Sequence, residues 1–248
     1  MKIALLLPTR ERIENKKRLL KSIKDTATNT DNVVLYMGID DDDPTKEDVI
    51  KLCGDYSWVK IVEIHNEGKF LGLGKLFNLC AKEAKEEILS LIGDDMVFQT
   101  KDWDSKIIEE FNEENCPKDK FKMVYVYDGW HGNRLAVNAF LHRSYYDING
   151  YFAREEFMAN CLDKWLQRIF FVFGRLKYKS DIYLEHKHWL FRKSDKDNVS
   201  DNLLKYHSPI QDETIWTSLK EQRLEEAQRI SQKLGLEFDK TKLEDQKK

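Results

Sequence analysis

The sequence has few cysteines, little net charge and no long apolar run, and each shortage excludes a class of protein. Its 4 cysteines in 248 residues are too widely spaced for a CxxC pair or the usual zinc patterns, so we expect buried free thiols. The 41 basic and 44 acidic residues leave a net charge of −3, which provides no overall field for gathering a phosphate polymer. No apolar run approaches the roughly 20 residues of a membrane span, and none resembles a signal peptide. These shortages predict a protein of the reducing cytoplasm without a membrane span.

The first half of the chain alternates short apolar runs with amphipathic segments. Each apolar run predicts a buried strand and each amphipathic segment predicts a helix. This alternation is typical of a mostly parallel sheet with helices on both faces. The predicted strands are residues 3–7, 33–39, 59–64 and 88–92, and the predicted helices are residues 12–24, 46–52, 70–85 and 103–113. Ligands bind such sheets at the carboxyl ends of the strands, so the residues after each strand are candidate site residues.

The second half of the chain predicts strands over residues 123–127, 137–142 and 182–184 and an aromatic-rich helix over residues 157–173. We expect one α/β domain over residues 1–210, in two halves of about residues 1–100 and about residues 101–210. A charged C-terminal helix and tail follow over residues 211–248. The apolar stripe of this helix predicts packing on the body of the domain or on a partner subunit, which would form a homo-oligomer. The stripe consists of Trp216, Leu219, Leu224, Ala227, Ile230 and Leu234.

The first predicted strand leads into a helix through a Pro-Thr-Arg-Glu-Arg segment. A hydroxyl and two guanidinium groups at this place suit a nucleotide, because arginine can bind phosphate through two hydrogen bonds and a helix N-terminus favours anions. A solvated helix start is the alternative. The candidate residues are Pro8, Thr9, Arg10 and Arg12.

Acidic residues follow two of the predicted strands directly. Asp40 is expected to accept hydrogen bonds from a base or ribose, whereas Asp41 to Asp43 suit a solvated turn and helix cap equally well. Asp94 and Asp95 follow the fourth strand, and adjacent carboxylates there suit Mn²⁺ or Mg²⁺, which is held by carboxylates together with substrate phosphates. An ordinary turn is the alternative for this pair.

Four side chains of the second half could also take part in chemistry. Asp163 stands on the aromatic-rich helix, where partial desolvation would raise its pKa and suit a general base toward a hydroxyl group. A helix-surface acid is the alternative. His186 could complete an oxygen-rich metal site, and His188 lies two residues further on. Packing or hydrogen bonding is the alternative for these histidines. Trp130 and His131 could stack on a sugar ring or base, although aromatic residues at such spacing are usually core.

Taken in order, these segments resemble the GT-A glycosyltransferases, in particular their family 2-like inverting members, over about residues 3–190. The matching positions are the Pro-Thr-Arg end of the first strand, Asp40, Asn78, the Gly93-Asp94-Asp95 segment, Asp163 and the Glu-His-x-His segment that contains His186. The resemblance implies a three-layer α/β/α GT-A fold with a C-terminal helical extension. Two positions depart from the family pattern: Ile92 stands where an acid is usual, and Leu162 stands where a glutamate usually precedes the base.

The resemblance also implies a donor half of about residues 1–100, an acceptor half of about residues 101–210, and roles for the matching residues. Asp40 would bind the base of the donor, and Asn78, in the helix before the metal motif, would contact the donor nucleotide together with Asp94. Asp163 would be the catalytic base. Asp94, Asp95 and His186 would hold the metal. The implied activity is the metal-dependent transfer of a hexose from a nucleoside diphosphate sugar, most simply a UDP-sugar, to a hydroxyl acceptor with inversion. A glycan, a protein, a small molecule and a modified nucleobase all remain open as acceptors.

Two other functions fit the same sequence features. A sugar-phosphate nucleotidyltransferase uses a similar sheet and metal, but the glycine-rich loop typical of that class is absent, because the segment after the first strand contains no glycine. A non-catalytic protein that binds a nucleotide or sugar is the second alternative. Pyrophosphate release would favour the first, and donor binding without turnover would favour the second.

Overall fold

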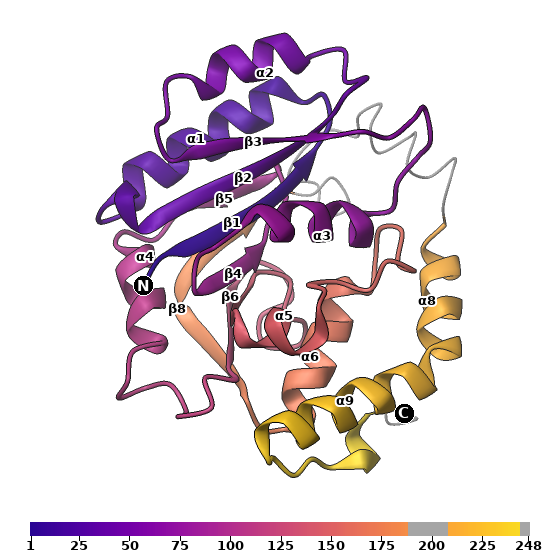
Figure 1. The fold of residues 1–248 in the computed structure, drawn as a ribbon. Coiled ribbons are helices and arrows are strands. Elements are labelled where there is room, and N and C mark those ends of the chain that lie inside the picture. The colour runs from indigo at the N-terminus through magenta and orange to yellow at the C-terminus, as the bar shows by residue number, and fades with distance from the viewer. Residues whose placement is uncertain (188–207, 244–248) are drawn as a thin grey trace.

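The computed structural model describes residues 1–187 and 208–243. In this part of the chain eight strands form one sheet with the order β3-β2-β1-β4-β7-β6-β8-β5 (Figure 1). The strands are β1 (Ile3–Thr9), β2 (Val33–Asp40), β3 (Val59–Ile64), β4 (Ile88–Leu91), β5 (Met96–Phe98), β6 (Met123–Tyr127), β7 (Ala139–His142) and β8 (Leu176–His186). Four strand pairs are parallel, and the three that involve β5 or β7 are antiparallel. The expectation of a mostly parallel sheet is confirmed.

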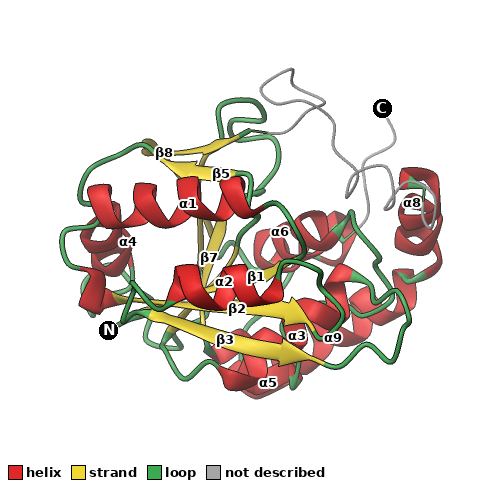
Figure 2. Ribbon diagram, turned by 90° about the horizontal axis from the view of Figure 1, so that it is seen from above, coloured by secondary structure: helices red, strands yellow, loops and turns green. Residues whose placement is uncertain are grey.

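Helices cover both faces of the sheet. The elements on one face are α1 (Ile13–Thr26), α2 (Lys46–Cys53) and α4 (Trp103–Glu110). Those on the other face are α3 (Leu73–Glu83), α5 (Ser144–Asn149), α6 (Leu162–Val172) and α9 (Lys220–Leu234), with α8 (Pro209–Ser218) before α9 and short 3-10 turns at Thr30–Asn32 and Lys240–Lys242. Figure 2 shows α1 and α2 lying over the strands. The result is the three-layer α/β/α arrangement that the alternating pattern predicts.

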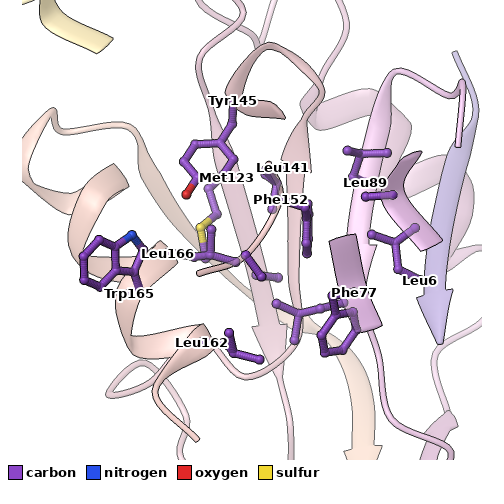
Figure 3. Close-up of a cluster of buried hydrophobic side chains, with 14 of the residues drawn as sticks. Leu6, Phe77, Leu89, Met123, Leu141, Tyr145, Phe152, Leu162, Trp165 and Leu166 are labelled. Carbon is purple, nitrogen blue, oxygen red and sulfur yellow. The ribbon is translucent and has the colours of Figure 1, made fainter. Parts of the chain in front are cut away.

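Both faces of β1 are buried, and its side chains alternate between the two helix layers. Leu5 and Leu7 pack with α1 and α4, whereas Ala4 and Leu6 pack with α3 and α6. Figure 3 shows Leu6 in the buried cluster on the side of α3 and α6. In this cluster the side chains of the sheet pack with Phe77, Phe152 and Trp165. A strand buried on both faces is apolar at successive positions, and this is why the sequence pattern identified the central strands.

Two short elements and one helix start differ from the prediction. β5 and α5 were not predicted, because segments of three and six residues are too short to show a period. The helix expected over residues 157–173 begins only at Leu162, since Cys161 before it has a left-handed backbone with φ of 66°. β8 extends further toward the N-terminus than residues 182–184. His188 lies outside the described residues.

The C-terminal segment forms two helices that pack on the body of the same chain. The predicted single helix is broken at Leu219, between α8 and α9. Trp216, Leu219 and Ile230 are buried in the same cluster as Leu6 and Trp165, and Figure 1 shows α9 beside α5 and α6. The apolar stripe is therefore largely covered within the chain, which accounts for it without a partner subunit.

The described residues include all four cysteines and the helices that could be compared with a membrane span. All four cysteines are free thiols, with Cys53, Cys80 and Cys161 buried and Cys116 half-buried. Among the helices of residues 1–187 and 208–243, none combines the length and the apolar character needed to cross a membrane.

The start of α3 lies in backbone contact with the segment that precedes α6. Leu73 and Gly74 donate their amide hydrogens to the carbonyl oxygens of Met158 (2.8 Å) and Phe157 (3.2 Å). A Cβ atom on Gly74 would lie 2.0 Å from the carbonyl oxygen of Arg154. Only glycine permits this approach, because backbone on both sides leaves no flexible group to move away.

We expect Gly74→Ala to lower the free energy of unfolding by about 1–3 kcal/mol or more, as overpacking does in a close-packed interior. Gly54→Ala is the control, because Gly54 has a right-handed helical backbone and an added Cβ would lie 3.3 Å from its nearest neighbour. Its effect should stay below about 1 kcal/mol. Urea denaturation measures both, and equal effects would contradict the close contact at Gly74.

Asp104 joins α4 to the turn between α1 and β2. Its fully buried carboxylate accepts hydrogen bonds from the amides of Thr28 (2.6 Å) and Asn29 (3.2 Å) and from the side chain of Asn32 (2.9 Å). Burial by itself raises the pKa of Asp104, but these hydrogen bonds to the charged form outweigh burial and leave the pKa below its usual value of 3.8.

We expect Asp104→Asn to lower the free energy of unfolding at pH 7 by about 1–3 kcal/mol, because buried amides lose an acceptor. The folded-state pKa is lowered, so the stabilisation is complete above about pH 4 and is lost as the pH falls through that pKa. The difference between wild type and variant should therefore narrow at acid pH in urea denaturation. Asp31→Asn, at an exposed position of the same turn, is the control. A difference that persists unchanged to pH 2 would contradict this role.

Candidate active site

Acidic residues gather at one edge of the sheet. Asp40 ends β2, Asp94 follows β4, and Asp128 follows β6 directly. β6 runs parallel to β4, because each is antiparallel to β7 between them. The carboxyl ends of these strands therefore meet at the same edge, where ligands bind such sheets. Asp128 was not singled out from the sequence, although an acid directly after a strand is the same signal that identified Asp40 and Asp94.

Asp94 is buried and paired with two of the predicted nucleotide-binding residues. Its carboxylate accepts a hydrogen bond from the hydroxyl of Thr9 (2.7 Å) and lies 3.3 Å from a guanidinium nitrogen of Arg12. Burial raises the pKa of Asp94, and Arg12 opposes this shift by favouring the charged form. The structure thus brings together the ends of β1 and β4, and the carboxylate of Asp94 is directed to Thr9 and Arg12.

The turn after β1 is stabilised by hydrogen bonds with buried residues whose role the sequence did not reveal. Glu11 and Arg12 both have left-handed backbones, with φ of 54° and 52°. The fully buried ammonium group of Lys16 donates to the carbonyl oxygen of Glu11, and the carboxylate of Asp43 accepts from the Glu11 amide (2.9 Å). Burial lowers the pKa of Lys16, and Asp94 and Asp43 oppose the shift. Asp43 is buried, so the alternative of a solvated turn is wrong for this residue.

Arg10 neutralises part of the acidic run after β2. Its guanidinium group lies 3.2 Å from the carboxylate of Asp40 and also pairs with Asp42, while Asp41 lies 3.2 Å from the imidazole of His65. Burial raises the pKa of Asp40, and the hydrogen bond from Arg10 opposes this. Arg10 and Asp40, both predicted to contact the donor nucleotide, are therefore direct neighbours.

Strand β5 places Asp95 beside His186. β5 pairs with β8 in a register that sets Met96 opposite His186, and the amide of Lys187 donates to the carbonyl oxygen of Asp95 (2.9 Å). As a result, Nε2 of His186 lies 3.3 Å from a carboxylate oxygen of Asp95. The sequence predicted that these two residues belong to one site, but it did not predict the strand pair that brings them together.

The predicted three-residue metal site is only partly assembled. Among residues 1–187 and 208–243, no group of three or more His, Cys, Asp or Glu side chains is arranged to hold a metal ion. Asp94 is paired with Arg12, whereas Asp95 and His186 face each other. An oxygen and an imidazole ligand fit Mn²⁺ or Mg²⁺ if the remaining ligands come from substrate phosphates and water, which is the usual arrangement for Mg²⁺.

Asp163 lies in the first turn of α6. Its carboxylate accepts a hydrogen bond from the amide of Lys164 (2.7 Å). Burial raises the pKa of Asp163, while the Lys164 amide and the imidazoles of His131 and His186 act in the opposite direction. A carboxylate with a raised pKa has the character expected of a general base.

Asp128 organises the loop that carries Trp130 and His131. One carboxylate oxygen accepts from the amides of Trp130 (3.0 Å) and His131 (2.8 Å), and the other lies 2.6 Å from the His131 imidazole. The carbonyl oxygen of Asp128 accepts from the amide of His186 (3.1 Å), so this loop is attached directly to the end of β8. The Trp130 side chain is 54% exposed, unlike a core residue.

Asn78 is directed away from these residues. Its side-chain oxygen accepts from the amides of Phe152 and Ala153 (2.8 Å each), and its nitrogen donates to the carbonyl oxygen of Ala153 (2.9 Å) and to Glu155 (3.2 Å). The amide group thus holds the segment between α5 and α6.

Several solved structures resemble the fold of this chain. TarS 1-349 of S. aureus in complex with UDP-GlcNAc superimposes with a TM-score of 0.65 at 14% identity, over 98% of this chain and 69% of that chain. The mannosyltransferase PcManGT from Pyrobaculum calidifontis, in complex with GDP-Man and Mn²⁺, gives a TM-score of 0.57 at 11% identity, over 77% of this chain and 60% of that chain. The chain has their α/β fold. The GT-A fold class predicted from the sequence is thereby confirmed.

These similarities concern the fold, since the identities are far below those of close relatives. No protein-family model matches the chain, and no curated protein matches it. The chain spans about 60% of the length of another TarS 1-349 structure, which superimposes with a TM-score of 0.57. Proteins that share a fold can differ in activity, because the activity depends on the residues of the site.

Proposed function

We propose that the chain is a metal-dependent glycosyltransferase that moves a hexose from a nucleoside diphosphate sugar to a hydroxyl acceptor with inversion. The observation that carries the proposal is the Asp95–His186 pair at the carboxyl edge of the sheet, with Asp163 near enough for the charges of His186 and His131 to act on its pKa. The sugar nucleotides and Mn²⁺ bound to proteins of similar fold support it. UDP is the nucleotide we favour, from the sequence resemblance and the UDP-GlcNAc complex.

The donor nucleotide would lie over the ends of β1, β2 and β4. Arg10 and Arg12 would pair with phosphate oxygens, and Asp40 would accept hydrogen bonds from the base or ribose. Pro8, Thr9 and Asp94 would lie under the donor and contact it from the side of the sheet. Thr9 and Asp94 are joined to each other by a hydrogen bond. Asn78 has a supporting role, since its polar atoms are bonded to the segment before α6.

Asp95 and His186 would hold Mn²⁺ or Mg²⁺ together with oxygens of the donor diphosphate. When bound, the metal supplies positive charge that stabilises the departing diphosphate. Asp163 would remove the proton from the acceptor hydroxyl as its oxygen bonds to the anomeric carbon, and the bond from that carbon to the diphosphate oxygen would break on the opposite side. This direct displacement inverts the configuration at the anomeric carbon.

The acceptor would approach from the side of Trp130 and His131. The exposed Trp130 ring can stack on a sugar, and His131 is oriented by Asp128. A glycan, a protein, a small molecule and a modified nucleobase all offer the required hydroxyl group, so the acceptor class is left to experiment.

Donor turnover tests the proposal without knowledge of the acceptor. The chain is incubated with Mn²⁺ and UDP-GlcNAc or GDP-Man. Hydrolysis of the donor, with water in place of the acceptor, is followed by the release of the nucleoside diphosphate. Release that stops on addition of a chelator supports the proposal. Pyrophosphate release from a nucleoside triphosphate and a sugar phosphate would instead favour a nucleotidyltransferase. Donor binding without turnover, including with mixed glycan acceptors, would favour a non-catalytic binding protein.

A further inference from the structure

The segment before α6 leads directly to Asp163 and has little regular structure of its own. On its α3 side it is held by Asn78, which binds the backbone of residues 152–153, and by the amides at the start of α3, which bind the carbonyl oxygens of Phe157 and Met158. These contacts account for one side of the segment. The opposite side faces the C-terminal helices.

Asp212 in the first turn of α8 binds this opposite side. Its carboxylate, which is fully buried, accepts hydrogen bonds from three successive amides, those of Met158 (3.0 Å), Ala159 (3.1 Å) and Asn160 (2.7 Å). Hydrogen bonds from neutral donors to a carboxylate are stronger than those to a neutral acceptor. One side chain from α8 therefore fixes the backbone of three residues immediately before Cys161.

Glu226 of α9 provides a second attachment. It is also fully buried, and its carboxylate accepts from the hydroxyl groups of Tyr145 (2.7 Å) and Tyr151 (2.5 Å) and from the indole of Trp165 (3.1 Å). Trp165 is two residues beyond Asp163 on α6. The C-terminal helices thus bind the chain on both sides of the proposed base, at residues 158–160 before it and at Trp165 after it.

The left-handed backbone of Cys161 explains why such attachments matter. A non-glycine residue in this conformation is disfavoured by roughly 1–2 kcal/mol, so the surrounding contacts must maintain it. The conformation of Cys161 sets where α6 begins, and Asp163 lies in the first turn of that helix. A change in the backbone of residues 158–160 would therefore move the Asp163 carboxylate.

We infer that α8 and α9 belong to the catalytic unit and that Asp212 is a positioning residue for Asp163, an inference that rests on the proposed function. Asp212 acts through the backbone of residues 158–160 and touches neither donor nor acceptor. Displacing a reacting group by about 1 Å can lower turnover by about 100-fold, so a modest shift of α6 suffices for a large effect.

Asp212→Asn tests this role with little change of shape, because it places an NH₂ group where the carboxylate accepted amide hydrogens. We expect hydrogen exchange at residues 158–160 to accelerate and UDP affinity with Mn²⁺ to stay within about twofold. We expect UDP-GlcNAc or GDP-Man hydrolysis, expressed per UDP-binding site counted by calorimetry, to fall by about 10-fold to 100-fold. The pH at which hydrolysis declines on the acid side should also shift, since Asp163 changes its surroundings.

Glu110→Gln is the matched control. Glu110 is a buried acid that pairs with Lys122 at 3.0 Å, remote from Asp163 along the chain and in the opposite helix layer. The Glu110→Gln variant should be less stable than the wild type. Its turnover per UDP-binding site and the pH at which its hydrolysis declines on the acid side should be unchanged. A general loss of folded protein would lower the number of UDP-binding sites in both variants and leave turnover per site unchanged.

Two results would overturn the inference. Unchanged exchange at residues 158–160 in Asp212→Asn would show that the carboxylate does not hold this backbone, whatever the activity of the chain. Faster exchange with unchanged turnover per site would reduce Asp212 to a stabilising residue. A wild-type chain that binds UDP but hydrolyses neither donor would contradict the proposed function. Hydrogen exchange would then still decide whether Asp212 holds the backbone of residues 158–160.

Discussion

Asp163→Asn is expected to reduce donor turnover by about 10²-fold to 10⁴-fold, the contribution typical of a general base. The amide keeps the shape of the carboxylate and can still accept the hydrogen bond from Lys164, but it cannot take a proton. UDP affinity in the presence of Mn²⁺ should be unchanged, because Asp163 lies on α6 and not at the ends of β1, β2 or β4. The measurement is the rate of nucleoside diphosphate release together with calorimetric UDP binding.

The pH dependence of turnover provides a second check on the same residue. Burial raises the pKa of Asp163, and the base must be unprotonated to act. Turnover by the wild type should therefore fall as the pH drops through a pKa above the usual 3.8, and the residual activity of Asp163→Asn should lack this decline.

Asp147→Asn is the control for Asp163→Asn, since Asp147 is an exposed acid of α5 whose carboxylate lies 3.3 Å from Arg143. It should behave as wild type in both rate and pH dependence. If Asp163→Asn retained full turnover, the base would have to be another group, and His131, oriented by Asp128, would be the next residue to replace.

Asp95→Ala is expected to abolish the metal-dependent part of UDP binding. Even outer-shell partners of a bound metal contribute about 10-fold to 100-fold in affinity, so loss of a direct ligand should cost at least that much. Calorimetric titration of UDP with Mn²⁺, repeated in chelator, measures the effect. In chelator the wild type and the variant should bind UDP equally weakly, because Asp95 acts only through the metal.

Base selectivity and specificity follow from the same titrations. GDP and thymidine diphosphate, measured beside UDP, report the base preference set around Asp40 and Arg10.

Asp181→Ala is the control for Asp95→Ala, because it removes an exposed acid from the same strand as His186. UDP affinity that is identical with and without Mn²⁺ in the wild type would contradict the metal site, and absence of binding by any diphosphate would contradict the donor site as a whole.

Much of the fold could be predicted because its central strands are buried on both faces. β1, β2 and β4 are apolar at nearly every position, and β1 and β2 end within two residues of their predicted limits. β5 was missed because three residues carry no period. The start of α6 was misplaced because residues 157–161 are apolar enough to resemble a helix, whereas their backbone is held by α3 and Asp212.

The residue types of the site were also recognisable, but their partners were not. Acids directly after strands marked Asp40, Asp94 and Asp95, and β1 predicted Thr9 and Arg12. Nothing local distinguishes Asp94, which pairs with Arg12, from Asp95, which faces His186 across a strand pair. Lys16 and Asp43 resemble solvated surface residues in the sequence and are buried in the structure.

The sequence alone determined the layers of this protein, the edge of the sheet at which its acidic residues gather and the chemical types of side chain found there. These follow from apolar periodicity and from the order of strands, which are local properties of the chain. Only the tertiary structure decided which carboxylate meets which partner, where α6 begins, and that Asp212 and Glu226 hold the segment before Asp163. Those outcomes depend on contacts between residues far apart in sequence, and burial, which sets both their strength and the pKa of Asp163, exists only once the chain has packed.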